Sequence, residues 1–459
     1  MAFPTSSSNH AQPVLGLKPN TSYTIAVSVT DQQGHVIDLE SAFNVVTAPL
    51  PVDFPIVDVK TSIPELMEPG FILFDRFTRG RNADPELNLY SIIVDKNGDV
   101  VWYSEFGGQP MIQLDNGNLF YPSRDNLPSL NIDMADFVEL DKLGNIVSLI
   151  DAVQLHHDLF PTTHGTFLGL VGGTREINNY PTSETDPNAP TQTATITFSP
   201  VIEIDSDGSI INRWDPVDIL DQVRIGYGSL NQTPGGLDWG HANAVFHDER
   251  DDSIVISIRH QDAVVKFSRS TGELVWILGN HDNWSAEFLP YLLTPVGTPF
   301  EWQYHQHAPM ITDSGTIMLF DNGNFRASPF DGKTPLSVLE TYSRAVEYEI
   351  NKETMEVRQV WEYGTSSSPR LHASFISDAD SLPITRNTLI DFGGLRIIDG
   401  VSTSNLQLGA VVTRIVEVTH ETPAQVVFDI MLYNPDGRIQ TYRAEKIPSL
   451  YATDVVVTH

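Results

Sequence analysis

The sequence contains no cysteine among its 459 residues. Disulfide bridges, zinc–thiolate sites and cysteine nucleophiles are therefore excluded together. Basic residues are also scarce, because 27 Lys and Arg stand against 59 Asp and Glu, for a formal net charge of −32. Nucleic-acid binding needs a basic surface, so this balance argues against a nucleic-acid partner. An anionic small molecule would need a local positive pocket in this acidic chain.

Long apolar runs and nucleotide-binding loops are missing as well. No stretch approaches the ~18–20 apolar residues of a membrane-spanning helix, so no membrane partner is expected. The first residues, MAFPTSSSNHAQP, lack the basic start and apolar core of a secretory leader. Neither a G-x-x-x-x-G-K-[ST] loop nor a G-x-G-x-x-G turn occurs, so no nucleotide donor is indicated.

What the sequence does contain is a repeated hairpin, in which two strands of alternating polarity flank a tight turn. Six copies span residues 90–103, 137–150, 201–214, 264–277, 345–361 and 413–430. A second hairpin type lies between them, at residues 107–123, 155–171, 240–259, 306–323 and 371–394. Residues 438–451 are expected to pair with 70–77 and close a ring. Two hairpins per unit make a four-stranded blade, so an all-β, six-bladed β-propeller is predicted.

A different segment precedes the ring. Residues 14–51 alternate strongly and carry the L-x-P-x-T-x-Y pattern of a fibronectin-like β-sandwich. About fifty residues cannot supply the usual seven strands of that fold, so a small or truncated sandwich is expected. The predicted organisation is a sandwich-like domain at 1–52, a linker at 53–69 and the propeller at 70–459, with insertions between blades at 215–240 and 280–304.

Four histidines occupy the same place in four blades, at the start of an inner hairpin. They are His157, His241, His307 and His372. The innermost strands of a propeller line its central channel, so these imidazoles are expected to converge. Strand alternation should turn His156 and His305 to the opposite face, as structural or exposed residues. The remaining candidates, His164, His260, His281 and His420, show no such pattern and receive no role.

Three kinds of function are compatible with a histidine-lined channel. Imidazoles with a carboxylate such as Asp158 or Asp238 can bind a metal. Alternatively, a histidine can act as a nucleophile on an anionic group, or the ring can be a non-enzymatic binding scaffold. Arg259, at the far end of the hairpin that begins at His241, would repel a cation and suit an oxyanion. An interblade salt bridge is the alternative role for Arg259.

Longer stretches show a specific resemblance. The sequences HHD, DWGHANAVFHDERDDSIVISIRHQDAVVKFSRSTGELVWILG, QYHQHAPM, LFDNGN, YSRAVEYEI and VWEYG closely resemble the bacterial arylsulfate sulfotransferases. The resemblance runs from about residue 60 to the C-terminus. It implies a six-bladed propeller with a small N-terminal sandwich, and ping-pong transfer of a sulfuryl group through a sulfohistidine. The implied partners are an aryl sulfate donor and a phenolic acceptor, with no cofactor and no metal.

The resemblance also implies roles for individual residues. His307 of QHAPM matches the nucleophile, and His241 with Asn243 forms the H-x-N motif. Arg259, His157 and Asn243 would hold the sulfuryl oxygens, while His241 would transfer protons. His372 and Tyr442 are added as substrate-binding candidates.

The resemblance further suggests a periplasmic or secreted protein whose native leader has been removed, and a homodimer is one arrangement compatible with it. The alternatives that stay open are a metal-dependent propeller hydrolase or lyase and a binding scaffold.

Overall fold

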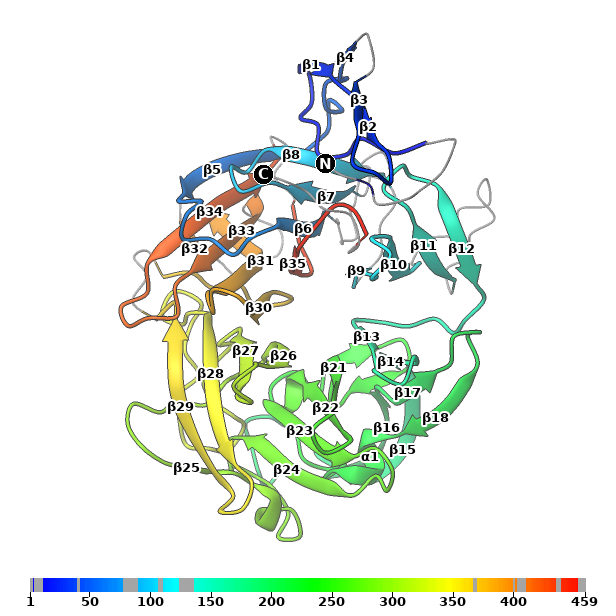
Figure 1. The fold of residues 1–459 in the computed structure, drawn as a ribbon. Helices are drawn as coiled ribbons and strands as arrows, with labels where there is room; N and C mark the ends of the chain where they lie inside the picture. Colours follow the sequence, from blue (N-terminus) through cyan, green and yellow to red (C-terminus); the bar gives the residue numbers. More distant parts are fainter. Residues whose placement is uncertain are drawn as a thin grey trace.

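The computed structural model is a ring of β-sheets around a common centre (Figure 1). It describes residues 3, 11–38, 42–76, 90–105, 110–123, 136–365, 370–398, 401–402, 410–434 and 439–452. Within these ranges the ring contains six sheets of four or more strands, each running outward from the centre. The predicted all-β propeller class is confirmed by this arrangement.

The first three sheets have four strands each. From the centre outward, the first consists of β35 (Ala444–Ile447), β6 (Phe71–Arg76), β7 (Tyr90–Val94) and β8 (Val100–Ser104). The second consists of β9 (Ile112–Gln113), β10 (Leu119–Pro122), β11 (Phe137–Leu140) and β12 (Ile146–Ile150). The third consists of β13 (Leu159–Pro161), β14 (Phe167–Leu170), β17 (Val201–Ile204) and β18 (Ile210–Trp214). The first sheet joins a strand near the C-terminus to three early strands, which closes the ring.

The other three sheets follow in chain order. The fourth consists of β21 (Ala242–Asp248), β22 (Ser253–Ile258), β23 (Ala263–Ser268) and β24 (Leu274–Gly279). The fifth consists of β26 (His307–Ile311), β27 (Ile317–Asp321), β28 (Arg344–Asn351) and β29 (Glu356–Tyr363), with β25 (Thr294–Pro295) at its outer edge. The sixth consists of β30 (Asp378–Ser381), β31 (Thr388–Ile398), β33 (Ala410–Val418), β34 (Val426–Tyr433) and β5 (Ile56–Ser62), with β32 (Val401–Ser402) beside β31.

The strand pairing agrees with the predicted hairpins. All six outer hairpins pair as antiparallel neighbours. The closing strand β35 pairs with β6, as expected from residues 438–451 and 70–77. The turn glycines Gly98, Gly144, Gly208 and Gly272 have φ of 80°, 84°, 89° and 73°. An L side chain rarely adopts this conformation, which explains glycine at the tight turns.

Two features of the fold differ from the sequence prediction. The segment predicted as a linker, 53–69, contains β5, which pairs with β34 as the outer strand of the last sheet. The hairpin of β15 (Gly173–Tyr180) and β16 (Gln192–Phe198) is an insertion that the repeat pattern did not indicate. It forms a separate sheet with β19 (Gln232–Thr233) and β20 (Gly236–Asp238). The remaining helical pieces are α1 (Pro216–Ile219), η2 (Arg259–Gln261) and η3 (Leu289–Tyr291).

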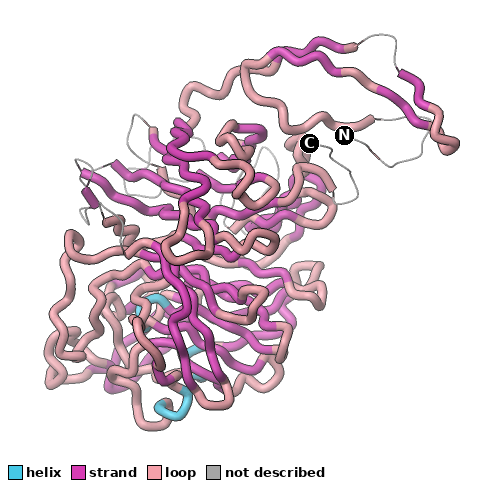
Figure 2. The backbone as a smooth tube through the Cα atoms, turned by 60° about the vertical axis from the view of Figure 1, so that its left-hand side comes forward, coloured by secondary structure: helices cyan, strands magenta, loops and turns pink. Residues whose placement is uncertain are grey.

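The N-terminal segment projects away from the ring (Figure 2). Its described residues form two separate two-stranded ribbons, β1 (Ser22–Ile25) with β4 (Phe43–Val46) and β2 (Ser28–Thr30) with β3 (Val36–Asp38). Residues 1–2, 4–10 and 39–41 of the predicted domain lie outside the described residues. A packed sandwich at 1–52 therefore stays a prediction.

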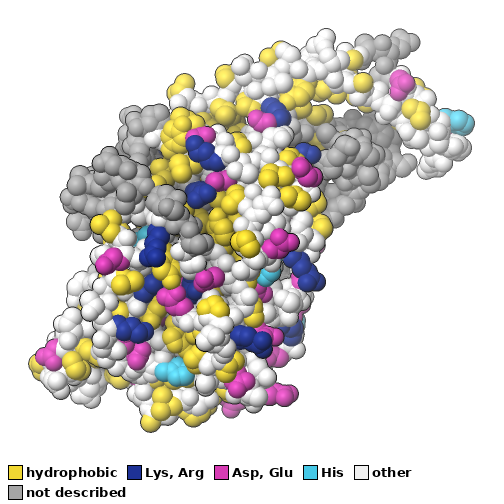
Figure 3. Space-filling model, turned by 90° about the vertical axis from the view of Figure 1, so that its left-hand side faces the viewer, with side chains coloured by type: hydrophobic (Ala, Val, Ile, Leu, Met, Phe, Trp, Pro, Cys, Tyr) yellow, Lys and Arg dark blue, Asp and Glu magenta, His cyan; other side chains and the backbone are white. Residues whose placement is uncertain are grey.

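Apolar side chains between neighbouring sheets form the core. The largest cluster joins the third and fourth sheets through the β15–β16 insertion and includes Trp239, which is 1% exposed. On the side of the ring shown in Figure 3, basic and acidic side chains are interspersed. In the described part of the chain, no helix is long and apolar enough to cross a membrane.

Candidate active site

The histidines His157 and His241 stand directly before the inner strands β13 and β21. Both have a left-handed backbone, with φ of 63° and 52°. Such conformations are uncommon for residues other than glycine, and they are concentrated at functional sites. The two rings lie 4.9 Å apart, and the ring of His260 lies 4.9 Å beyond His241. Of the four repeated histidines, His157 and His241 are therefore brought together from separate blades, and the unpredicted His260 joins them.

His241 is oriented by a carboxylate. Its Nδ1 lies 2.7 Å from Oδ2 of Asp238, and its side chain keeps 32% of its surface exposed. Burial would raise the pKa of Asp238, but the His241 hydrogen bond and the neighbouring charges of His241 and Arg259 hold that pKa below its ordinary value. An ionised Asp238 requires a proton on Nδ1 of His241, which leaves Nε2 on the side of the ring away from Asp238. This is the arrangement of a histidine that exchanges protons with a ligand.

Arg259 lies beside His241 because the β21–β22 hairpin returns to its starting point. The backbone N–H of Arg259 donates to the His241 carbonyl at 3.3 Å, and the His260 N–H donates to the Gly240 carbonyl at 2.9 Å. The guanidinium donates through Nη1 to Nε2 of His260 (2.8 Å) and through Nη2 to the Ser374 carbonyl (3.1 Å). Its Nε is buried without a hydrogen-bond partner. A buried N–H donor without an acceptor suits an oxyanion.

His260, to which the sequence assigned no role, fixes this guanidinium. Its Nδ1 donates to the Asp238 carbonyl at 2.8 Å, which leaves Nε2 as the acceptor for Arg259. Burial, together with the charges of Arg259 and His241, lowers the pKa of His260 well below its ordinary value. Burial also lowers the pKa of Arg259, to about 10, against the opposing effect of Asp238. Arg259 therefore stays charged beside a neutral imidazole.

His307 opens strand β26 and is 4% exposed. Its Nδ1 lies 2.7 Å from Oδ1 of Asn322. The Asn322 amide nitrogen donates to the carbonyls of Ala373 (2.7 Å) and Ile376 (2.9 Å), so Oδ1 must face the imidazole. The proton of neutral His307 is therefore on Nδ1, and Nε2 carries a free lone pair. Burial, followed by the charge of Arg259, lowers the pKa of His307 well below its ordinary value.

His156 and His305 do not both follow the sequence prediction. Nδ1 of His156 lies 2.6 Å from Nδ1 of His157, so His156 contacts the cluster instead of facing away. His305 is 2% exposed and bonds Oδ1 of Asp262 at 3.0 Å, in agreement with a structural role. Its ring lies 5.8 Å from that of His260. His156 and His157 come together because they are adjacent in the sequence and His157 has a left-handed backbone.

Asn243, Tyr442 and His372 take positions around the cluster. Nδ2 of Asn243 donates to the Gln306 carbonyl at 2.8 Å, so the amide positions the residue before His307. Tyr442 is 4% exposed, its hydroxyl donates to the Asn243 carbonyl at 3.2 Å, and its ring lies 6.2 Å from that of His157. It is therefore buried next to His157 and Asn243.

His372 is held apart from the other imidazoles. Its Nε2 lies 3.0 Å from Oδ1 of Asn324, whose amide donates to the Ser374 carbonyl at 2.9 Å. The same carbonyl accepts from Arg259, so His372 reaches the cluster only through this chain of hydrogen bonds. His164, His281 and His420 bond Asp252, the Leu293 carbonyl and Glu347, away from the cluster.

The donor set fits an anion better than a cation. Asp238, His241 and His260 place ligand atoms within 4.8 Å of one another, which a metal ion could use. Both nitrogens of His260 are already engaged, however, by the Asp238 carbonyl and by Arg259. A guanidinium within hydrogen-bond distance of a ligand would also repel the cation. The Asp158 carboxylate accepts hydrogen bonds from Arg443 at 2.9 Å and from the Val245 N–H at 2.8 Å. It is therefore already bonded within the protein.

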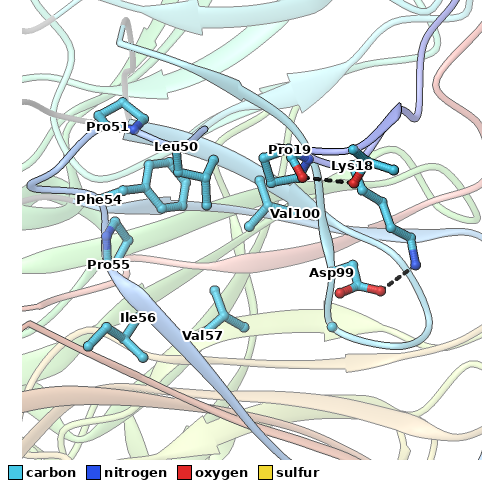
Figure 4. Close-up of a pocket in the computed structure, with 12 residues that line it drawn as sticks. Lys18, Pro19, Leu50, Pro51, Phe54, Pro55, Ile56, Val57, Asp99 and Val100 are labelled. Atoms are coloured by element: carbon cyan, nitrogen blue, oxygen red, sulfur yellow. Dashed lines mark hydrogen bonds and ion pairs between the residues drawn. The ribbon is translucent and has the colours of Figure 1, made fainter. Parts of the chain in front are cut away.

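A separate groove lies between the N-terminal segment and the first sheet (Figure 4). Leu50, Phe54 and Val57 line it together with the ion pair of Lys18 and Asp99, which lies at one side of the groove. No histidine lines this groove. The groove therefore belongs to the junction of the two regions and is distinct from the histidine cluster.

Comparisons of sequence agree with the resemblance seen above. The model of the family described as "Arylsulfotransferase (ASST)" matches residues 57–443. A protein named "Arylsulfate sulfotransferase AssT" from Escherichia coli is 31% identical over 240 residues, which cover 42% of this chain and 39% of the relative. A protein of the same name from Lelliottia amnigena is 29% identical over the same shares. The match thus spans about two-fifths of the length of these relatives.

Solved structures are similar only at a general level. A protein of unknown function from Bacteroides caccae has a TM-score of 0.41 at 11% identity, covering 82% of this chain and 98% of that protein. A putative 6-phosphogluconolactonase from Bacteroides uniformis has a TM-score of 0.36 at 11% identity, covering 79% and 82%. These values carry no argument about function.

Proposed function

Because the chain belongs to the arylsulfotransferase family, we propose that it transfers a sulfuryl group from an aryl sulfate ester to a phenolic acceptor through a sulfated His307. The observation that carries the proposal is the tautomer of His307. The Asn322 amide holds the proton on Nδ1 and leaves the Nε2 lone pair free. A neutral imidazole with a lowered pKa remains a nucleophile near neutral pH.

Arg259 is proposed to hold the sulfuryl oxygens. Its unpaired Nε–H is the buried donor that an oxyanion would satisfy, and His260 with the Ser374 carbonyl restrains the guanidinium plane. Sulfuryl transfer resembles phosphoryl transfer in requiring in-line positioning and charge stabilisation. His157 is proposed as a second contact, since its ring lies 4.9 Å from that of His241. Asn243 supports the site indirectly, by positioning the chain before His307.

In the proposed first half-reaction, the Nε2 lone pair of His307 forms a bond to sulfur. The bond between sulfur and the aryl oxygen breaks, and the oxygen leaves with the electron pair. His241 enters this step as an imidazolium whose Nδ1–H is held by Asp238. It gives its Nε2 proton to the leaving phenolate and becomes neutral. The substituted His307 ring is cationic, and the Asn322 oxygen accepts its Nδ1–H.

In the second half-reaction, His241 takes the proton of the acceptor phenol and the phenol oxygen attacks sulfur. The bond between Nε2 and sulfur breaks, and its electron pair returns to His307. The same pair of residues therefore serves both directions, with their protonation states exchanged. A free sulfated enzyme between the half-reactions implies ping-pong kinetics.

The test is a burst experiment with a chromogenic aryl sulfate and no acceptor. We expect one equivalent of phenol per active site, and the peptide carrying His307 should gain the mass of SO₃. Adding a phenol should discharge the label, and His307→Ala should abolish both burst and label. His281→Ala is a matched control, since His281 bonds the Leu293 carbonyl and packs against Trp302 instead of joining the cluster. Turnover without any labelled histidine would refute the covalent route, while turnover lost on chelation and restored by one divalent ion would favour a metal-dependent hydrolase.

The proposal includes a homodimer and a periplasmic or secreted location. Apolar side chains of the N-terminal ribbons support association, because Ile37 is 66% exposed, Phe43 53% and Val46 70%. Light scattering of the purified protein is expected to give twice the chain mass, and Ile37→Asp should reduce it to one chain. A single-chain mass for both the wild type and Ile37→Asp would refute the dimer. The proposed location is tested separately, by fractionation of native cells.

A further inference from the structure

A cluster of carboxylates lies where the ring closes, outside the histidine site. Asp378 and Asp380 come from β30, the innermost strand of the last sheet, and Glu445 comes from β35, the innermost strand of the first. Each contributes a carboxylate oxygen, and these atoms all lie within 4.8 Å of one another. Asp378 and Asp380 are two residues apart on one strand, so their side chains leave the same face.

A fourth carboxylate next to the cluster has no partner. Asp391 on β31 pairs directly with Asp378, so both side chains share one face of the sheet. Asp391 is 1% exposed, and neither of its carboxylate oxygens has a hydrogen bond. Oδ1 of Asp378 accepts from the Ala379 N–H at 2.9 Å, whereas its Oδ2 is buried and unpaired. Buried polar atoms are rarely left unpaired, so these oxygens call for a ligand.

One basic residue, Arg443, serves the group. Its charge acts on Asp378, Asp380 and Glu445. Its Nη2 also bonds Oδ2 of Asp158 at 2.9 Å, and Asp158 lies outside the cluster. A single guanidinium therefore faces four carboxylates, and the group lacks positive charge that a bound cation would supply.

The spacing suits a hard cation. Calcium binds carboxylate oxygens at about 2.3–2.6 Å, so two ligands on opposite sides of one ion lie about 4.6–5.2 Å apart. The limit of 4.8 Å among the three oxygens is compatible with a single shared ion. Calcium also tolerates irregular, carboxylate-rich coordination, whereas magnesium requires near-octahedral geometry and retains water.

We propose that Asp378, Asp380 and Glu445, with Asp391 beside them, bind one calcium ion that joins the last sheet to the first. Because the ligands come from the two sheets that close the ring, binding should stabilise the closed propeller. The proposal is independent of the transfer reaction at His307.

The test measures calcium binding and thermal unfolding of the full chain after chelation and dialysis. Titration calorimetry should show one tight site per chain, and saturating calcium should raise Tm by roughly 2 °C or more. Asp380→Asn should lose both effects. In calcium-free buffer its Tm should exceed that of the wild type, because one buried charge has been removed.

Asp313→Asn is the matched control, because Asp313 is exposed and carries the same charge change. It should behave as the wild type, and if Asp380→Asn does not fold, Glu445→Gln replaces it. If calcium raised the Tm of Asp380→Asn and of the wild type equally, calcium would be acting by screening surface charges and not by binding the cluster. No stoichiometric calcium binding to the wild type would refute the site. An equal response to magnesium would overturn the calcium assignment.

Discussion

The amide of Asn322 determines which nitrogen of His307 is available for chemistry. Two backbone carbonyls bind its N–H groups, so its oxygen can only accept from Nδ1 of the imidazole. His260 fixes Arg259 in a comparable way, because one of its nitrogens must donate to a carbonyl and the other accepts from the guanidinium. His307 and Arg259 are thus oriented by neutral hydrogen bonds. Among the described residues no carboxylate forms an ion pair with Arg259, although the charges of Asp238 and Asp262 favour its charged form.

At this scale, Arg259→Ala is expected to lower turnover by roughly 10²–10³, the usual loss for one important oxyanion donor. Arg259→Lys should recover little, since an ammonium lacks the planar fork. Steady-state kinetics with a chromogenic aryl sulfate measure both. Arg358→Ala is the control, because Arg358 is 59% exposed and pairs only with Glu349. Nearly normal activity in Arg259→Ala would show that Arg259 has only a structural role, through its hydrogen bond to the Ser374 carbonyl.

His372 provides a test of pH dependence. Burial lowers its pKa from 6.5 to about 4, so the unfolded chain binds this proton first as the pH falls. The stability due to neutral His372 is complete above about pH 6.5 and is lost between 6.5 and 4. Between pH 7 and 5 the wild type should lose about 2 kcal/mol that His372→Gln does not lose.

Urea unfolding of both proteins at the two pH values measures this difference, and the carboxylate contributions cancel in the comparison. An identical change in unfolding free energy for both proteins would contradict the shift at His372.

At the scale of elements, a hairpin brings distant residues together by returning to its starting point. The β21–β22 hairpin places Arg259 beside His241 through paired backbone bonds at its open end. The same geometry at β30–β31 aligns Asp391 with Asp378. Residues at the open ends of inner hairpins therefore supply the chemistry, while the turns face away from it.

The close approach of β31 to the segment before β35 predicts a steric limit at Gly393. A Cβ at this position would lie 1.9 Å from the Thr441 carbonyl oxygen. Gly393→Ala should therefore push the closing segment away and lower the free energy of unfolding by roughly 1–3 kcal/mol. Gly172→Ala is the control, since no atom lies within 4 Å of a Cβ there. Equal midpoints in urea for both variants would show that the closing segment adapts freely.

For the whole molecule, the formal net charge of −32 opposes the approach of an anionic substrate. The positive charge of Arg259 acts only at short range within this field. The screening length falls from about 30 Å at 0.01 M salt to about 8 Å at 0.15 M. Ionic strength should therefore control how often an aryl sulfate reaches the site.

We expect kcat/KM for the aryl sulfate to rise, by roughly two- to tenfold, between 0.01 and 0.15 M salt. The value for a neutral phenol acceptor should change little and provides the internal control, because the proposed ping-pong mechanism would separate the two constants. A fall of the donor constant with added salt would instead indicate that local basic groups dominate its approach.

Much of this architecture was predictable because strand alternation is a local property. The eleven hairpins, the pairing of residues 438–451 with 70–77, and the convergence of His157 and His241 follow from pattern and register. The β15–β16 insertion and the role of β5 were missed, because neither belongs to the repeat. His260 was missed for a related reason, since it occurs once and has no equivalent in other blades.

The sequence by itself determined the blade pattern, the placement of histidines at the inner strands and the position of Arg259 across a hairpin. These features depend on neighbours within one repeat, so local periodicity specifies them. Only the tertiary structure decided that Asn322 faces Nδ1 of His307, that His260 holds Arg259 and that Glu445 meets Asp378. Such contacts depend on side-chain direction and on closure of the ring, which join residues whose separation in the chain carries no periodic signal.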